Sequence, residues 1–295
     1  MDKLLDFLTR NQNFVLADGA MGTMLHAAGL TSGGAPEEWN MTRPDVLKGI
    51  HQAYIDAGSQ IITTNSFGGT RYRLALHNNQ DRVRELNLAA ARIAREVADA
   101  ASREVLVAGD IGPSGEILFP LGTTQPEDVR DAFAAQAAAL AEGGVDFFLI
   151  ETMSALEEVT AAVEGIKSAS DLPIAATMTF DTHFRTMMGV KPAQAVAALY
   201  DLGIVVLGAN CGNGPDEIER IVTDLAAAKP QGVYLIAQSN AGLPKWVNKE
   251  VHYDGSPEVM ADYALKMRAL GVNVVGACCG STPDHIRAMR EALGL

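Results

Sequence analysis

Cysteine and positive charge are both scarce in this chain of 295 residues. Its three cysteines are an odd number in a chain of this length, so a disulfide framework is implausible. Lys and Arg number 23 against 36 Asp and Glu, which gives a formal net charge of −13. Such a chain repels nucleic-acid backbones and anionic membrane surfaces. We therefore expect neither nucleic acid nor a membrane as a partner.

Long hydrophobic runs are also missing, so the sequence predicts no transmembrane helix. Asp2 and Asp6 lie where a secretory signal would need an apolar core, and we therefore predict a cytoplasmic protein. Hydrophobic residues make up 48% of the chain and charged residues 20%, which excludes intrinsic disorder. No linker or composition shift divides residues 1–295, so we expect a single domain. The sequence leaves open whether copies of the chain form a homo-oligomer.

Short runs rich in Val and Ile alternate with stretches in which apolar residues recur three and four positions apart, as in residues 83–97. The runs occur at eight places: 14–16, 61–64, 105–108, 145–150, 173–177, 204–207, 233–237 and 272–276. Eight strand–helix repeats in a chain of this length predict an α/β fold, the (β/α)8 TIM barrel. A doubly wound open sheet is the alternative.

Polar residues and cysteines follow the predicted strands, where a barrel of this kind builds its active site. They are Asp18 and Gly19, Asn65, Asp110, Glu151 and Thr152, Phe180 and Asp181, Asn210 and Cys211, Asn240, and Cys278 and Cys279. All three cysteines of the chain are in this set. Three thiolates at one barrel mouth would suit zinc and leave the fourth position open, as in catalytic zinc sites. The alternative is that they are inert, buried fillers.

The charge of such a centre indicates its chemistry. Zinc with three thiolates is formally −1, so a thiol that binds as fourth ligand loses its proton yet stays nucleophilic. This favours alkyl transfer onto sulfur over hydrolysis, for which neutral ligands such as His are commoner. Because Cys278 and Cys279 are adjacent, the backbone there must leave strand geometry, and we expect strain that Gly276 and Gly280 permit.

Several motifs at the strand ends together resemble the homocysteine S-methyltransferase family. The motifs are DGAMGT at 18–23, TNSFG at 64–68, GDIGP at 109–113, ET at 151–152, GANC at 208–211 and GACCG at 276–280. This family includes betaine–homocysteine methyltransferases and the homocysteine-binding domain of cobalamin-dependent methionine synthase. The resemblance implies that residues 1–295 form a homocysteine-binding barrel with one zinc ion, a methyltransferase that methylates the homocysteine thiol to methionine.

The resemblance also implies roles for individual residues. The implied zinc ligands are Cys211, Cys278 and Cys279, and the implied substrate-binding residues are Asp18, the Gly19 amide, Thr64, Glu151 and Asn240. Asp18 and Glu151 would hold the amino-acid end of homocysteine, and Thr64 would contact its carboxylate. The Asn240 side-chain oxygen would occupy the fourth zinc position until the substrate displaces it.

Structural roles remain open for several of these residues. Asp18 could be a turn or cap residue, Glu151 an ion-paired strand end, and Asn240 a turn former before glycine. We interpret Asp110 as a cap residue or as a hydrogen-bond anchor for the loop through Gly112 and Pro113. Glu151, if functional, is expected to hold the substrate ammonium and not to act as a general base.

The methyl donor is not settled by the sequence. Betaine needs aromatic faces for its quaternary ammonium, yet Gly68 and Thr152 stand where the animal betaine enzymes have tyrosines. Trp39, in a segment that resembles the betaine and S-methylmethionine branches, could supply part of a cage. The chain lacks the further domains of full-length methionine synthase, so we expect either betaine or a methyl-corrinoid carried by a separate protein. The alternatives are S-methylmethionine as donor, or a non-catalytic barrel that binds zinc or a sulfur amino acid.

Overall fold

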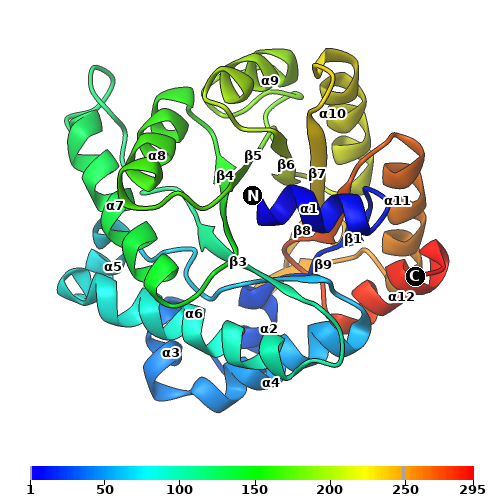
Figure 1. Ribbon diagram of the computed structural model, residues 1–295, viewed down its shortest axis with the longest axis horizontal. Helices are drawn as coiled ribbons and strands as arrows, with labels where there is room; N and C mark the ends of the chain where they lie inside the picture. Colours follow the sequence, from blue (N-terminus) through cyan, green and yellow to red (C-terminus); the bar gives the residue numbers. More distant parts are fainter. Residues whose placement is uncertain (1, 248–249) are drawn as a thin grey trace.

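Parallel strands alternate with helices along the chain, and the strands form one sheet that curls into a nearly closed barrel (Figure 1). The computed structural model describes residues 2–247 and 250–295. In order around the barrel, the strands are β1 (Val15–Leu16), β10 (Val274–Ala277), β7 (Tyr234–Ser239), β6 (Val206–Cys211), β5 (Ile174–Met178), β4 (Phe147–Met153), β3 (Leu106–Ile111) and β2 (Ile61–Thr63). A single bridge between Ala17 and Ile61 joins β1 to β2. The predicted (β/α)8 barrel is therefore confirmed, and the open sheet is not.

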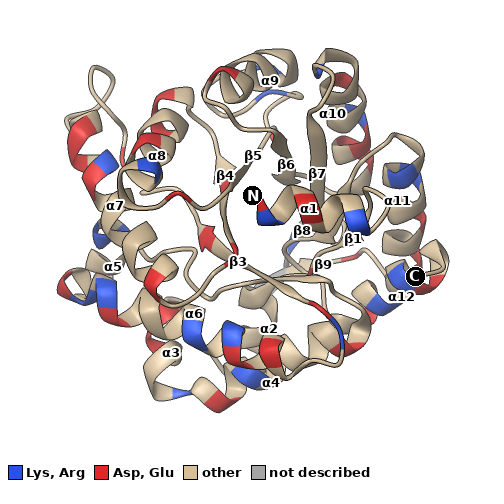
Figure 2. Cartoon of the chain, viewed as in Figure 1, with Lys and Arg blue, Asp and Glu red and all other residues tan. Residues whose placement is uncertain are grey.

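Helices surround the barrel and connect its strands (Figure 1). The long ones are α4 (Pro44–Ala57), α6 (Val83–Ala100), α7 (Pro126–Glu142), α8 (Leu156–Ala169), α9 (Pro192–Asp201), α10 (Pro215–Ala228), α11 (Pro257–Ala269) and α12 (Pro283–Leu293). Six of these begin with proline, which suits a first helical turn where no N–H donor is needed. Acidic and basic residues are interspersed along the outer helices (Figure 2).

Shorter elements lie at the two ends of the barrel. They are α1 (Lys3–Arg10), α2 (Met21–Ala27), α3 (Trp39–Thr42), α5 (Arg71–Ala75), the 3-10 turns η1 (Pro36–Glu38) and η2 (Gln80–Arg82), and the hairpin β8 (Pro244–Val247) and β9 (Glu250–Tyr253). No helix in the described ranges combines the length and the apolar character needed to cross a bilayer.

The strands separate two hydrophobic cores because successive side chains point to opposite faces. Val206 belongs to the cluster inside the barrel, whereas Leu207 belongs to the layer between strands and helices. Leu4 and Phe7 of α1 join the inner cluster. Helix α1 thus closes the amino end of the barrel, the end that faces the viewer in Figure 1.

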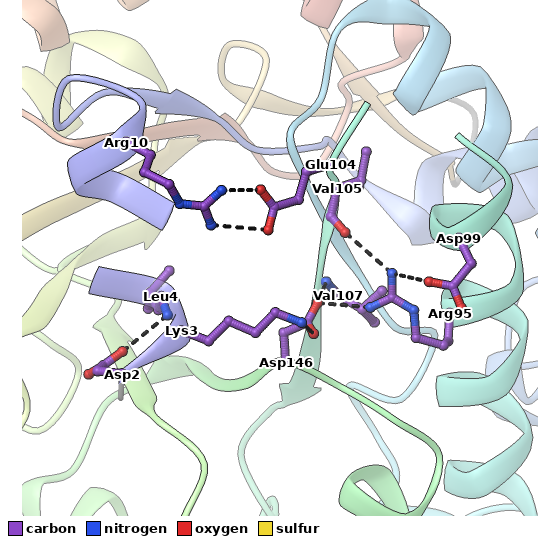
Figure 3. A network of polar contacts seen from close by, with 10 residues as sticks. All are labelled: Asp2, Lys3, Leu4, Arg10, Arg95, Asp99, Glu104, Val105, Val107 and Asp146. Atoms are coloured by element: carbon purple, nitrogen blue, oxygen red, sulfur yellow. Dashed lines mark hydrogen bonds and ion pairs between the residues drawn. The ribbon is translucent and has the colours of Figure 1, made fainter. Parts of the chain in front are cut away.

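Ion pairs fasten α1 to this amino end (Figure 3). The buried carboxylate of Asp146 pairs with Lys3 of α1 and with Arg95, whose Nη1 lies 2.9 Å from Asp146 Oδ2. The backbone N–H of Val107 donates to the same oxygen at 2.7 Å. Nearer the surface, Arg10 and Glu104 form a two-bond pair. The amino end is thus closed by paired charges.

The predicted strand boundaries need correction at the carboxyl ends. Strand β3 runs to Ile111 and β4 to Met153, so Asp110 and Glu151 lie within strands and not after them. Cys211 is likewise the last residue of β6. Asp110 pairs in register with Leu149, and Cys211 with Ser239. The predicted strands ended too early because they were defined by apolar residues. At the carboxyl end of the barrel, residues with polar side chains still form the backbone hydrogen bonds of the sheet.

Candidate active site at the carboxyl end of the barrel

A cavity of about 390 Å³ opens at the carboxyl ends of the strands. Its lining includes seven of the eight residues named from the sequence: Asp18, Gly19, Thr64, Glu151, Cys211, Cys278 and Cys279. Asn240, the eighth, lies beside the cavity, where its backbone N–H donates to the Cys211 carbonyl at 3.4 Å. The carboxyl end of the barrel therefore brings together the predicted site.

The three cysteines form one cluster, with their Sγ atoms all within 4.8 Å of one another. Cys211 Sγ lies 2.7 Å from Cys278 Sγ, which lies 3.9 Å from Cys279 Sγ. All three are free thiols. Among the His, Cys, Asp and Glu side chains of the described residues, these three form the group that lies close enough together to share a metal ion. The structure thus joins two strand ends that are about 70 positions apart in the sequence.

The backbone around the thiols is strained, but not quite where we expected. Gly280 has a φ of 83°, and a Cβ there would lie 2.3 Å from the ring of Tyr253. Gly276 has no positive φ; a side chain is excluded because its Cβ would lie 3.0 Å from the Asp18 carbonyl oxygen. Cys211 itself has a φ of 59°, which is uncommon outside glycine. Part of the strain is therefore in a proposed ligand.

The side-chain amide of Asn210 holds this strained region in place. Its Oδ1 accepts hydrogen bonds from the Thr152 N–H at 2.9 Å and from Thr177 Oγ1 at 2.8 Å. Its Nδ2 donates to Thr152 Oγ1 at 2.7 Å and lies 3.7 Å from Cys211 Sγ. Thr152 also has a positive φ, 63°. One buried amide thus ties the ends of β4, β5 and β6 together beside the thiols.

The thiols polarise one another. The pKa of Cys279 falls well below its usual range because Cys211 and Cys278 direct hydrogen bonds toward its sulfur. The same contacts, together with burial, raise the pKa of Cys278. Close thiols that cannot all ionise together are the donor set that a soft cation such as zinc neutralises. The residues present therefore fit a zinc ion.

Two predicted carboxyl groups face the same cavity. The Asp18 carboxylate accepts from the Thr63 N–H at 2.8 Å and from Thr63 Oγ1 at 3.2 Å. Burial nevertheless raises the pKa of Asp18 to about 7. Burial and the nearby Cys279 thiolate raise the pKa of Glu151 to about 8. Neither acid forms an ion pair with Lys or Arg within the described chain, so these residues do not support the ion-paired alternative for Glu151.

Asp110 is a third acid in this cavity, and our interpretation of it as a loop anchor was wrong. Its Oδ1 is buried and has no hydrogen-bond partner among the residues described. Burial, followed by the charges of Glu151 and Asp18, raises its pKa well above the usual range. Its place at a strand end, like that of Asp18 and Glu151, was the signal that could have identified it.

Two further residues, Gly19 and Thr64, were predicted to bind the substrate. The Gly19 amide lines the cavity, and a Cβ at Gly19 would lie 2.5 Å from Ser281 Oγ. Thr64 Oγ1 accepts from the Asp110 N–H at 3.0 Å and lies 2.6 Å from Ser66 Oγ. Because Ser66 donates its own proton to the Asp110 carbonyl, the Thr64 proton must point to Ser66. The Thr64 hydroxyl therefore serves the scaffold.

The side chain of Asn240 has one bonded and one unbonded polar atom among the described residues. Its Nδ2 donates to the Gly212 carbonyl at 2.6 Å, while its Oδ1 is buried without a partner in the described chain. Trp39, in contrast, lies in α3 and does not line the cavity. The Arg43 guanidinium covers its ring at 4.8 Å. The suggested contribution of Trp39 to a donor cage is therefore not supported.

Sequence reasoning missed a group of residues at the helix α5 side of the cavity. Glu37, Phe67, Arg73 and His77 all contribute to its lining. Glu37 is buried and accepts from the Gly68 N–H at 2.8 Å. These residues come from the connections that follow β1 and β2 and not from strand ends.

Comparison with known proteins gives both sequence and structural relatives. The model of the homocysteine S-methyltransferase family matches residues 15–293. The methionine synthase of Mycobacterium tuberculosis is 36% identical over 305 residues, and that of Mycobacterium leprae is 35% identical over 300 residues. The alignments cover 98% and 97% of this chain. The chain spans about a quarter of the length of these relatives, 25% in each case.

Solved structures of the homocysteine methyltransferase MmuM from Escherichia coli have the same fold. The oxidized form superposes with a TM-score of 0.82 at 23% identity, over 98% of this chain and 99% of that one. The metallated form gives a TM-score of 0.80 at 23% identity, over 97% of this chain and 99% of that one. The whole barrel, including both of its ends, is thus shared.

Proposed function

Because the chain belongs to the homocysteine S-methyltransferase family, we propose that residues 1–295 form a homocysteine-binding barrel that methylates the homocysteine thiol to give methionine. The observation that supports this proposal most directly is that three thiols and three carboxyl groups line the same cavity. Soft ligands for a metal lie beside groups suited to an ammonium. A structural zinc site alone would not require the acids.

Cys211, Cys278 and Cys279 would hold one zinc ion per chain. When bound, zinc would lower the pKa of the homocysteine thiol, so that the sulfur reacts as a thiolate. Asn240 Oδ1, a buried acceptor without a partner in the described chain, would serve as fourth ligand in the absence of substrate. The Asn210 amide would keep Cys211 in its strained conformation and so preserve the spacing of the thiols.

The substrate's amino-acid end would be held by the acids and the nearby backbone. Glu151, Asp18 and Asp110 would surround the ammonium, each gaining a charge-assisted interaction on ionisation. The Gly19 amide would donate to the carboxylate. Thr64 would support this contact by holding the Asp110 backbone, since its own proton is directed to Ser66. These contacts would orient the sulfur toward the methyl group.

The transfer itself would be a direct displacement. The homocysteine sulfur would form a bond to the methyl carbon, while the bond from that carbon to the donor atom breaks and its electron pair stays with the donor. The thiol proton is already lost when the substrate binds, so Glu151 is not needed as a base. Betaine, or a methyl-corrinoid on a separate protein, remains the proposed donor, and S-methylmethionine is the alternative.

Calorimetry of homocysteine binding tests the first half of this proposal. The zinc-loaded protein should bind homocysteine with release of a proton near neutral pH, because the thiol must ionise. Titrations in buffers of different ionisation enthalpy would reveal that proton as a buffer-dependent heat. Binding without any buffer dependence would contradict ionisation of the thiol on binding.

A donor panel tests the second half. Betaine, S-methylmethionine, methylcobalamin and methylfolate would each be assayed for methionine formation with the zinc-loaded protein, with Cys211→Ser as the inactive control. Methionine from at least one donor is expected. Homocysteine binding without turnover by any donor would instead support the alternative of a non-catalytic barrel.

A further inference from the structure

Arg73 lines the cavity, and its side chain has no partner among the described residues. It lies in the short helix α5, lines the cavity and is half-buried. Its guanidinium forms no hydrogen bond or ion pair with any described residue, although its backbone N–H donates to Thr70 Oγ1. A guanidinium carries five donors in a planar fork. Because these N–H donors have no partner among the described residues, they are available to a ligand in the cavity.

Two loop glycines lie beside the Arg73 side chain. A Cβ on Gly68 would lie 3.5 Å from Arg73 Cβ and 2.8 Å from Glu37 Oε1, so Arg73 and Glu37 flank the same glycine. A Cβ on Gly115 would lie 3.4 Å from Arg73 Cδ and 3.5 Å from its Nη1. The Arg73 side chain therefore reaches from the loop after β2 to the loop after β3, at the wall of the cavity.

Charge is divided along the cavity. The lining includes the acids Asp18, Asp110 and Glu151 beside the thiols, and Arg73 is the one Arg among the described lining residues, which include no Lys. Phe67 supplies an aromatic side chain to the lining. A cationic methyl group would be attracted to the acidic part, where the sulfur nucleophile is expected. An anionic group on the same molecule would be attracted to Arg73.

We propose that Arg73 binds the carboxylate of a small methyl donor, so that the donor is a zwitterion with a methylated onium group and a carboxylate. The inference rests on the proposed function and narrows its choice of donor. A guanidinium binds a carboxylate through two parallel hydrogen bonds, which would fix the donor's direction in the cavity. On transfer, the onium atom keeps the electron pair of the broken bond to carbon and becomes neutral.

Glu37 fits this arrangement as a positioning residue. Its carboxylate is bonded to the Gly68 N–H and lies close enough to His77 and Arg73 for both charges to oppose the effect of burial on its pKa. Within the described residues, Glu37 and Arg73 form no ion pair with each other. Glu37 therefore lies near Arg73 and leaves the N–H groups of its guanidinium available to a ligand.

The test compares Arg73→Gln with Arg71→Gln. Arg71 is two positions away and exposed, and it already donates to Tyr72 Oη and to the Asp128 carbonyl, so it is a matched control outside the cavity. Betaine binding to the zinc-loaded full chain would be measured by calorimetry, and donor KM by methionine formation. Choline, which has the onium group but no carboxylate, is the second probe, and S-methylmethionine is the third.

For wild type we expect betaine or S-methylmethionine to bind at least tenfold more tightly than choline. Arg73→Gln should raise Kd and KM for the acid-bearing donor at least tenfold, with kcat much less affected and choline binding unchanged. Arg73→Lys should recover part of the loss, and Arg71→Gln should match wild type. Homocysteine affinity should be the same in all four proteins.

Equal binding of betaine to wild type and Arg73→Gln would overturn the proposal, as would equal losses for betaine and choline. Turnover with methylcobalamin, with no binding of either zwitterion, would also overturn it while leaving the proposed function intact. Failure of the proposed function looks different: homocysteine would not bind, or no donor would give methionine. The calorimetric comparison of betaine with choline would still test Arg73 in that case.

Discussion

The two ends of this barrel treat buried carboxylates in opposite ways. At the amino end, Asp146 is bonded to Lys3, Arg95 and the Val107 N–H. At the carboxyl end, Asp18, Asp110 and Glu151 share one cavity, and none forms an ion pair with Lys or Arg of the described chain. Asp146 directly precedes strand β4, and Glu151 lies within the same strand nearer its carboxyl end.

We interpret the paired carboxylate at the amino end as structural and the unpaired acids at the carboxyl end as functional. A buried carboxylate with cationic and backbone partners fastens the fold, and its loss leaves buried charges unpaired. A group of buried acids without cationic partners destabilises the empty protein, because no nearby positive charge offsets their desolvation. Such an arrangement persists where a ligand supplies the missing charge. Substitutions at the amino end should therefore affect stability, and those at the carboxyl end should affect binding and activity.

The largest expected effect is at the thiols. Cys211→Ser should abolish zinc binding and methionine formation while leaving the fold intact, because the proposed function assigns the three thiols to the metal. Elemental analysis, activity and circular dichroism would measure the three properties. The triple Cys→Ala variant sharpens the test: stoichiometric zinc in that protein would show that the ligands lie elsewhere.

At the opposite end, Asp146→Ala should lower the free energy of unfolding by about 3 kcal/mol, since it removes the carboxylate that binds Lys3, Arg95 and the buried Val107 N–H. Methionine formation per folded molecule should not change. Glu104→Gln is the matched control, because the Arg10–Glu104 pair is exposed and should be worth less than about 1 kcal/mol. A loss of activity in folded Asp146→Ala would break the division between the two ends.

Glu151→Gln should keep zinc but weaken homocysteine binding by roughly 1.5–3 kcal/mol, the range for a lost hydrogen bond to a charged group. kcat should fall as well, because a displaced sulfur reacts slowly. Calorimetry and steady-state kinetics would measure the two effects. Unchanged affinity, with an altered pH profile of turnover alone, would return the role of general base to Glu151.

Asp18 should make the metal-free protein less stable as pH rises. Its pKa is about 7 in the folded protein against 3.8 for an ordinary aspartate, so between these values the folded state binds more proton than the unfolded state. Its contribution is therefore present below pH 4 and lost as pH rises toward 7, by up to about 1.4 kcal/mol per pH unit.

Asp18→Asn should lack this contribution and show a flatter dependence of unfolding free energy on pH. Urea denaturation at pH 5, 6 and 7 would compare the two proteins. Parallel curves for wild type and Asp18→Asn would mean that Asp18 is ionised in the folded protein over the whole range.

The repeats and the strand-end residues were predictable from the sequence because both depend on local patterns. Alternating apolar runs and helical spacings identified eight strand–helix units, and the rule that functional residues follow strands led to the thiols, Asp18 and Glu151. The strand ends were placed too early because apolarity was the only signal used. Asp110 has a polar side chain in the cavity while its backbone still pairs with Leu149.

The residues outside the strands were not predictable in the same way. Arg73 lies in a five-residue helix whose sequence resembles any exposed helix start. It lies beside Gly68 and Gly115, which come from two different loops. Trp39 shows the converse error, because a promising aromatic residue is instead covered by Arg43. Contacts between loops are set by tertiary packing, and local patterns do not report them.

The seam between β1 and β2 gives Asp18 a second role. The barrel closes there through one backbone bridge, and the Asp18 carboxylate accepts the Thr63 N–H just beyond it. A side chain thus continues the ladder where the two-residue strand β1 ends. A ligand ammonium that favours ionised Asp18 would also strengthen this bond. Substrate binding should then slow the hydrogen exchange of the Thr63 amide, because local opening between β1 and β2 becomes rarer than in the empty protein.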